Sequence, residues 1–233
     1  MTEDQKRFVK EKFSRVTRGY DLVNRLGSFG QDAFWRRRAA GELADFPGPL
    51  LDLCAGTLAL SLELVRQKPR TVVALDITPE MLRYGVYRFR RDRRLSFIQA
   101  VCGDAEELPF ASNTFYGLTM AFGLRNLARP KKGLLEMYRV LKPGGKAVIL
   151  EFSRPKNPLF APLYRSYLRY VMPLLGGMIT GDREAYLYLA RSIYRFPDPE
   201  VVMAWMEEAG FTKLRAYPLT LGVVTIYTGL KPR

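Results

Sequence analysis

Short apolar runs alternate with helix-length amphipathic stretches along the middle of the chain. They predict strands at 50–53, 72–76, 95–99, 115–122 and 146–151, and helices around 58–67, 78–92, 130–141 and 198–209. Pro143-Gly144-Gly145 is expected to break the chain sharply before the fifth strand. Strands spaced by helices form right-handed βαβ units, and two later runs at 213–218 and 223–229 predict a terminal antiparallel hairpin. We therefore expect an α/β fold with a mostly parallel seven-stranded sheet and helices on both faces.

Two helical regions lie outside this alternating core. We expect a helical lead-in over about 1–45 and a helical insertion over about 156–195. Both are expected to belong to a single domain that spans 1–233. In the insertion, apolar residues recur at helical spacing from Pro158 to Met178, with Arg165 and Arg169 on another face. Such a helix covers a sheet edge, packs in a dimer or closes over a ligand, and its spacing does not choose among these roles.

The net charge of the chain excludes few classes of binding partner. Lysine and arginine number 37 against 23 acidic residues, a net charge of +14 that attracts RNA, DNA, an anionic membrane surface or an acidic small molecule. The basic clusters at 36–38 and 88–94 are typical of solvated helix faces, and no zinc-finger or RNP-like pattern accompanies them, so no nucleic-acid partner is expected. No run approaches the roughly 18 apolar residues of a membrane span, and the first residues lack a signal-peptide core. We expect a cytoplasmic protein.

The chain contains no histidine, which removes the commonest general base, the commonest zinc ligand and every Ser-His or Cys-His nucleophile system. Cys54 and Cys102 are the only cysteines, and we expect both to be reduced packing residues. No metal site is expected.

The polar residues that follow the predicted strands are the candidate ligand contacts, because open α/β sheets bind ligands beyond the carboxyl ends of their strands. Gly56 permits a tight turn, and Thr57 either adds a hydroxyl contact or caps the next helix. Asp76 is suited equally to a ribose diol and to capping a helix. Asp104 could accept from an adenine amine, although a turn aspartate is the commoner case.

A further polar pair follows the fourth predicted strand, in the run Phe122-Gly123-Leu124-Arg125-Asn126. Together with the segments below, this run resembles the ubiquinone/menaquinone biosynthesis C-methyltransferase family (UbiE/MenG), and the likeness extends almost end to end. The segments that carry it are Asp52 to Thr57, Asp76-Ile77, Gly103 to Phe110, Arg139 to Gly145 and Leu150 to Ser153, preceded by Tyr20-Asp21 and Trp35-Arg36 and followed by Tyr188-Leu189 and Phe196-Pro197.

The resemblance implies a Rossmann-like class I methyltransferase that uses S-adenosylmethionine (SAM) to methylate a ring carbon of a prenylated quinol. The ring would be of the demethylmenaquinol or the 2-polyprenyl-6-methoxy-1,4-benzoquinol type, and the sequence does not discriminate between them. Arg125 and Asn126 would hold and polarise the quinol oxygen. The positions implied to bind the cofactor are Asp52, Gly56, Thr57, Asp76, Ile77, Asp104, Ala105 and Ala121.

A polyprenyl quinol partitions into lipid, so the resemblance also implies a peripheral contact with the anionic inner face of the membrane. The helical insertion would then be a lid and an apolar channel for the isoprenoid tail. A homodimer is a further expectation that the sequence leaves open.

The chain departs from the family pattern beside the cofactor. Leu58-Ala59 stand where the family has Gly-Asp, Ala121 replaces a serine, and Tyr116 replaces an aspartate. Leu58 either points into the helix–sheet interface and leaves the turn intact, or narrows the pocket. In the second case the chain would be a divergent paralogue with weak or no activity. An RNA methyltransferase, suggested by charge alone, is the less favoured alternative. We expect retained activity.

Overall fold

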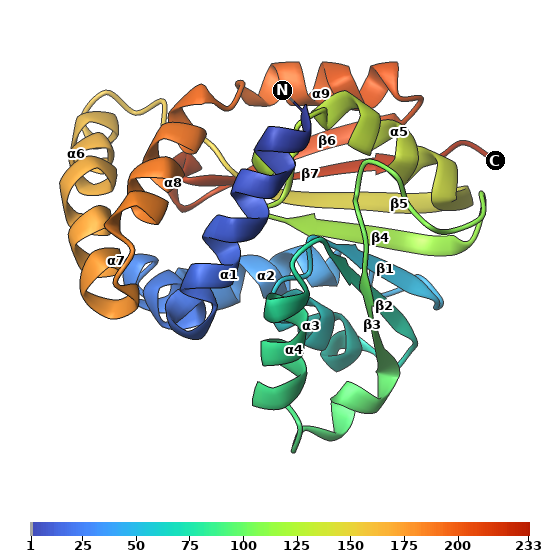
Figure 1. The fold of residues 1–233 in the computed structure, drawn as a ribbon. Coiled ribbons are helices and arrows are strands. Elements are labelled where there is room, and N and C mark those ends of the chain that lie inside the picture. The colour runs from blue at the N-terminus through green and yellow to red at the C-terminus, as the bar shows by residue number, and fades with distance from the viewer. Residues whose placement is uncertain (1) are drawn as a thin grey trace.

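One seven-stranded sheet organises the computed structural model, which describes residues 2–233 (Figure 1). Its strand order is β3-β2-β1-β4-β5-β7-β6; β7 runs antiparallel to both of its neighbours, and the other pairs are parallel. This confirms the predicted mostly parallel sheet with a C-terminal antiparallel hairpin. The strands are β1 (Leu50–Leu53), β2 (Val72–Asp76), β3 (Ile98–Cys102), β4 (Phe115–Ala121), β5 (Leu141–Phe152), β6 (Thr212–Leu219) and β7 (Val224–Leu230).

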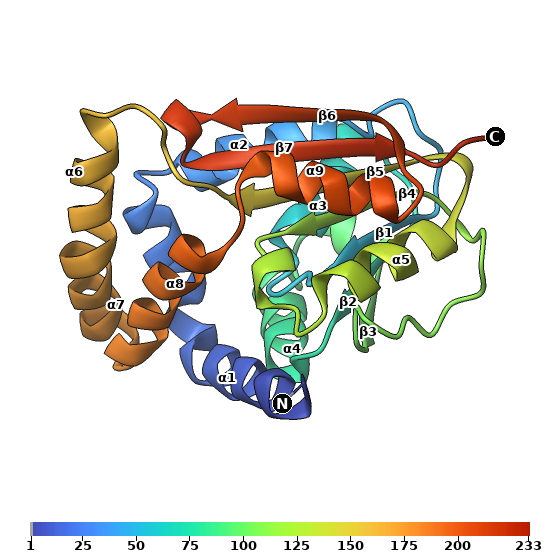
Figure 2. The same ribbon diagram turned by 90° about the horizontal axis from the view of Figure 1, so that it is seen from above.

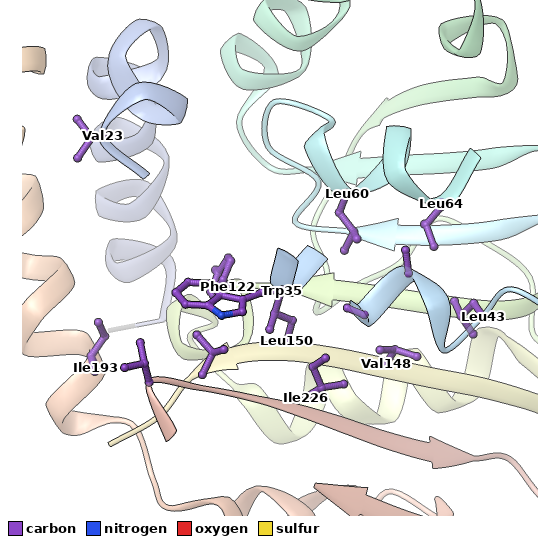
Figure 3. Close-up of a cluster of buried hydrophobic side chains, with 14 of the residues drawn as sticks. Val23, Trp35, Leu43, Leu60, Leu64, Phe122, Val148, Leu150, Ile193 and Ile226 are labelled. Atoms are coloured by element: carbon purple, nitrogen blue, oxygen red, sulfur yellow. The ribbon is translucent and has the colours of Figure 1, made fainter. Parts of the chain in front are cut away.

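Helices cover both faces of the sheet, as Figure 2 shows from above. One face carries α2 (Gln31–Gly41), α3 (Ala59–Gln67) and α4 (Pro79–Arg88), and the other carries α5 (Pro130–Val140) and α9 (Pro199–Glu208). Successive strand residues point to opposite faces, so Leu50 joins the core under α2 and α3, and Leu51 joins the core under α5 and α9. Trp35 and Phe122 close the first core at the carboxyl end of the sheet (Figure 3).

Several element boundaries differ from the sequence-based expectation: α4 ends at Arg88 instead of near 92, β3 lies three residues later than expected, and β5 begins five residues earlier. β3 begins at Ile98, because residues 93–97 form a short 3-10 helix η1 (Arg93–Phe97) whose first turn Asp92 caps by accepting from the Arg94 amide. β5 begins before the Pro-Gly-Gly run, which does not end the strand. The register passes from Phe115↔Leu141 to Gly117↔Lys146, so residues 142–145 form a bulge in the strand.

The remaining helices pack at the carboxyl end of the sheet. The long α1 (Thr2–Gly27) crosses in front of the strand ends and packs against α7, and α8 (Arg183–Arg195) packs against the same outermost helices (Figure 1). Those outermost helices are α6 (Phe160–Ser166), the π-helical turn η3 (Tyr167–Val171) and α7 (Met172–Thr180), which follow one another without a break. Short 3-10 turns η2 (Leu124–Asn126) and η4 (Thr220–Gly222) complete the described chain. Within residues 2–233, no helix is long and apolar enough to cross a membrane.

The two cysteines differ in their surroundings. Both are free thiols, but Cys102 is exposed, and only Cys54 is partly buried. The expectation that both are packing residues is therefore wrong for Cys102, because β3 is an edge strand whose outer positions face solvent.

Candidate active site

The sheet reverses its strand order between β1 and β4, and a cleft opens beyond the carboxyl ends of these strands. We call it the strand-end cleft; its empty volume, including the part open to solvent, is about 700 Å³. α1 forms its outer wall with Lys6, Val9 and Phe13. Of the residues predicted to contact a ligand, the cleft is lined by Gly56, Asp76, Ile77, Asp104, Ala105, Ala121 and Asn126.

Asp76 organises the floor of the strand-end cleft. Its two carboxylate oxygens accept hydrogen bonds from the backbone amides of Gly56 and Thr78, each at 2.8 Å. Burial raises the pKa of this carboxyl above its ordinary value, and the two amides oppose the shift. Helix α4 has Thr78 as its N-cap, so Asp76 ties two loops together and does not cap the helix. The Thr78 side chain also hydrogen-bonds to this carboxylate, which still leaves it at least one lone pair for a ligand.

Asp104 also lines the cleft, two residues after the end of β3, which pairs with β2, and its carboxylate is partly engaged. Its Oδ2 accepts from Lys6 Nζ at 2.6 Å, and its Oδ1 accepts from the Glu106 amide at 2.8 Å in a tight turn. Burial lowers the pKa of Lys6, but the hydrogen bond and charge of Asp104 outweigh it, so the net pKa is raised. The ion pair thus closes α1 over this side of the cleft.

Asp52 and Thr57 line a small cavity behind the cleft, which shares Gly56 and Ala121 with it, and their contact with a ligand stays a prediction. The Asp52 carboxylate is buried and accepts from the hydroxyls of Ser61 at 2.6 Å and Thr119 at 2.8 Å. The Thr57 hydroxyl donates to Asp21 Oδ1 at 2.8 Å and so is turned toward α1. Both side chains are already satisfied by protein partners, and they support the cleft from behind.

The position of Leu58 agrees with the first of the two alternatives that the sequence left open, in which the side chain points into the helix–sheet interface. Its side chain is fully buried against Ala74 and Leu82 in the helix–sheet interface and is absent from the cleft lining. Its backbone is left-handed, with φ 67° and ψ 14°, so the turn keeps the conformation that a glycine would favour. Gly85 makes room for it, because a Cβ there would lie 2.8 Å from Leu58 Cγ. The substitution therefore leaves the cleft open.

A second cavity, which we call the aromatic cavity, adjoins the strand-end cleft. Its empty volume is about 910 Å³, and it shares Phe13, Tyr20 and Phe122 with the cleft. Helices α1, α2, α6, α7 and α8 enclose it together with the ends of β4 and β5. Its lining is mostly apolar, with ring side chains from Phe13, Tyr20, Trp35, Phe122, Phe152, Tyr164, Tyr167, Tyr186 and Tyr188.

Arg125 is one of three cations, with Lys12 and Arg36, that line the aromatic cavity, and the Phe152 ring lies 5.1 Å from its guanidinium carbon. Its Nη1 donates to the Phe122 carbonyl at 2.6 Å and to Glu151 Oε1 at 2.7 Å, and its Nε donates to Ser192 Oγ at 3.3 Å. Glu151 is fully buried, so the ion pair fixes the guanidinium and balances its charge. Nη2 makes no hydrogen bond within residues 2–233, which leaves it available to a ligand.

Asn126 faces the other way, into the strand-end cleft. Its amide nitrogen donates to the Phe122 carbonyl at 3.1 Å, and its Oδ1 accepts from the Tyr188 hydroxyl at 3.1 Å. Tyr188 lines the aromatic cavity, so this hydrogen bond links the two spaces. The two residues predicted to act together thus donate to the same Phe122 carbonyl, although Arg125 lines the aromatic cavity and Asn126 lines the strand-end cleft.

The sequence analysis missed Lys6, Glu151 and Tyr188 as site residues. Glu151 could have been found, because it ends a predicted strand and strand ends were the positions searched. Lys6 and Tyr188 come from helices distant in sequence, 98 and 62 residues from their partners, and no local pattern marks them. Within residues 2–233, no group of three or more acidic or cysteine side chains could hold a metal ion.

The sequence matches known proteins along nearly its whole length. A model of the ubiE/COQ5 methyltransferase family matches residues 1–231. Demethylmenaquinone methyltransferase of Thermus thermophilus is 44% identical over 222 residues, which cover 94% of this chain and 100% of that protein. The ubiquinone/menaquinone biosynthesis C-methyltransferase UbiE of Geotalea daltonii is 39% identical over 226 residues, 96% of each chain.

The fold matches solved structures at much lower identity. A SAM-dependent methyltransferase from Aquifex aeolicus superposes with a TM-score of 0.62 at 17% identity, covering 91% of this chain and 97% of that one. Phosphoethanolamine N-methyltransferase 2 of Haemonchus contortus, in complex with SAM, gives 0.60 at 14% identity, covering 80% of this chain and 49% of that one. At such identities the likeness concerns the fold alone.

Proposed function

Since the chain belongs to the ubiE/COQ5 methyltransferase family, we propose that it transfers a methyl group from SAM to a ring carbon of a prenylated quinol. One observation supports this reaction above the others. The strand-end cleft and the aromatic cavity meet at Phe13, Tyr20 and Phe122, so a polar donor in the first and a flat apolar acceptor in the second can approach each other.

The residues of the strand-end cleft fit SAM. Its carboxylates, Asp76 and Asp104, keep free lone pairs that suit a ribose diol and an adenine amine, and Gly56 lets the backbone approach closely. Ala105 and Ala121 are small, and they leave room for the ring and the amino-acid end of the molecule. SAM supplies an electrophilic methyl group on a sulfonium centre when it is bound.

The residues of the aromatic cavity fit a quinol that needs orientation more than activation. A hydroquinone carbon is already electron-rich, so the chain needs no covalent nucleophile, consistent with the absence of histidine. Arg125 stays protonated and is a poor base, but its free Nη2 can hold and stabilise a quinol oxygen. The hydrogen bond from Tyr188 fixes Asn126 at the boundary between the strand-end cleft and the aromatic cavity. The phenolic proton would leave to water, the ring carbon would take the methyl group as the sulfonium becomes a thioether, and that carbon would then lose its own C–H proton to water while the oxygen is reprotonated.

Substrate range and location are part of the same proposal. The names of the relatives cover both ubiquinone and menaquinone synthesis, so the benzoquinol and the naphthoquinol both remain candidate rings. A cytoplasmic protein that contacts the inner face of the membrane would meet a lipid-dissolved substrate there. Pairing into a homodimer stays a prediction, to be checked by light scattering.

Product analysis by mass spectrometry tests the reaction. The purified protein is incubated with SAM carrying a deuterated methyl group and with a short-tailed demethylmenaquinol or a short-tailed benzoquinol. We expect the label on a ring carbon of at least one quinol. Binding of SAM without transfer to either ring would instead identify a silent paralogue and overturn the proposal.

A further inference from the structure

The outermost helical segment, from Leu159 to Met178, is apolar on two opposite faces. Its inner face places Tyr164, Leu168 and Met172 in the lining of the aromatic cavity. Its outer face exposes 87% of Leu159 and 70% of Met178. Leu163, Tyr170, Val171 and Leu174 are exposed between them, at the spacing of one helical stripe. We call these six side chains the outer stripe.

A solvated helix would carry polar residues on its outer face, so the outer stripe requires a partner. Phe29, in the turn between α1 and α2, is a further exposed ring beside this helical segment: the residue is 82% exposed, and its ring centroid lies 6.0 Å from that of Tyr167 in η3. Its backbone has φ 52°, a conformation that a bulky residue adopts at a cost of about 1–3 kcal/mol. The fold therefore keeps the Phe29 ring exposed to solvent in spite of this conformational cost.

The charge around the outer stripe identifies the kind of partner. No acidic residue occurs between Glu151 and Asp182. Of the cations in this interval, Arg154 and Lys156 pair with Asp198 and Glu200, whereas Arg165 and Arg169 have no acidic partner within residues 2–233. Arg165 and Arg169 are exposed on the same helical segment. A second copy would oppose these cations with cations, whereas an anionic lipid surface would attract them.

We propose that the outer stripe and Phe29 insert into an anionic lipid bilayer, with Arg165 and Arg169 at the headgroups. This inference rests on the proposed function, because a bilayer is where a polyprenyl quinol resides. The helix has a diameter of about 10 Å, so the cavity on its inner face lies one helix away from the lipid. In Figure 1, α6 and α7 form the edge of the molecule opposite α5 and the C-terminus, so most of the sheet lies away from the membrane.

Vesicle flotation tests the surface. Wild-type protein, a Leu174→Glu/Met178→Glu double variant and a Leu135→Glu control are mixed with phosphatidylcholine vesicles with and without phosphatidylglycerol. Leu135 is a matched control, because it is also exposed, by 52%, but lies on α5 at the opposite side of the sheet. We expect wild type and control to float with the anionic vesicles, and the double variant to bind them about tenfold more weakly.

Tryptophan fluorescence provides a second measurement, which reports insertion into the bilayer directly. In a Tyr170→Trp variant, fluorescence should be quenched by brominated lipid more than that of wild type, whose only tryptophans are Trp35 and Trp205. Equal binding by the double variant, failure of wild type to float, or loss of a dimer in the double variant by light scattering would overturn the proposal. Methylation of a short-tailed quinol without vesicles separates the two proposals, because it tests catalysis independently of the membrane.

Discussion

Leu58 shows how one residue can break a family pattern without closing a site. Its left-handed backbone costs about 1–2 kcal/mol, but its buried side chain contributes more than that to the helix–sheet interface. We predict that Leu58→Gly lowers the free energy of unfolding by about 2 kcal/mol and changes SAM affinity less than about threefold. Denaturant unfolding and calorimetry measure the two quantities. A large gain in SAM affinity would mean that Leu58 narrows the cleft after all.

Asp52 gives a prediction with a defined pH window. Burial raises the pKa of its carboxyl from 3.8 to about 6, so the folded state holds a proton that the unfolded state has lost between these values. The contribution of Asp52 to stability is thus complete below about pH 4 and falls as pH rises to about 6. Against Asp52→Asn, wild type should lose at most about 3 kcal/mol across this window. Urea unfolding at several pH values measures the difference, and parallel curves would refute the assignment.

Arg125 is predicted to act through its fixed geometry and not through charge alone. A lysine keeps the charge but cannot donate at once to Phe122, Glu151 and Ser192. Arg125→Lys should lower kcat by about 10²-fold and leave SAM affinity unchanged, because the residue lines the aromatic cavity and not the cleft. Steady-state kinetics with calorimetry separates these effects. Unchanged kcat would remove Arg125 from the reaction.

At the scale of elements, α1 is the piece that joins the two cavities. Lys6 pairs with Asp104, Asp21 accepts from Thr57, and Lys12 lies 3.6 Å from Asp182 beside α8. The same helix therefore covers the cofactor side and braces the helical insertion. Because it is a wall of the strand-end cleft, cofactor entry requires it to move or to leave a gap.

Removing the Lys6 contact should loosen this wall. We predict that Lys6→Ala raises both the association and dissociation rates of SAM several-fold. The reason is that α1 loses its ion pair with Asp104, which leaves the entrance to the cleft more open. Stopped-flow binding measures the two rates, and Lys10→Ala, an exposed site on the same helix, is the control. Slower association in Lys6→Ala would show that Lys6 recruits the cofactor and does not gate it.

The elements that the sequence predicted well are those with strong local patterns. β1 and β2 are short and apolar except for one aspartate each, and α5 has a clear apolar stripe after its proline. The sequence therefore placed each of these three elements within a residue or two. β3 and β5 were misplaced at their starts, because a 3-10 turn before β3 and a bulge in β5 depend on partners elsewhere in the chain. One such partner is Lys231, whose carbonyl accepts from the Gly144 amide.

At the scale of the whole molecule, the limit of sequence analysis is set by contacts between distant segments. The residues at strand ends could be identified, but Thr57 turns to Asp21, Arg125 to Glu151, and Asn126 to Tyr188. These partners lie 26 to 62 residues apart along the chain. Only the folded arrangement shows that Arg125 and Asn126 face different cavities.

The central claim is that the strand-end cleft of this chain binds SAM although Leu58-Ala59 replace the family's Gly-Asp. Calorimetric titration of wild type and Asp76→Asn with SAM tests it most directly, with thermal unfolding to show that the variant is folded. We predict saturable binding by wild type and at least about tenfold weaker binding by Asp76→Asn, which loses a charged acceptor facing the cleft. Absence of wild-type binding at millimolar SAM, or equal binding by both proteins, would contradict the account.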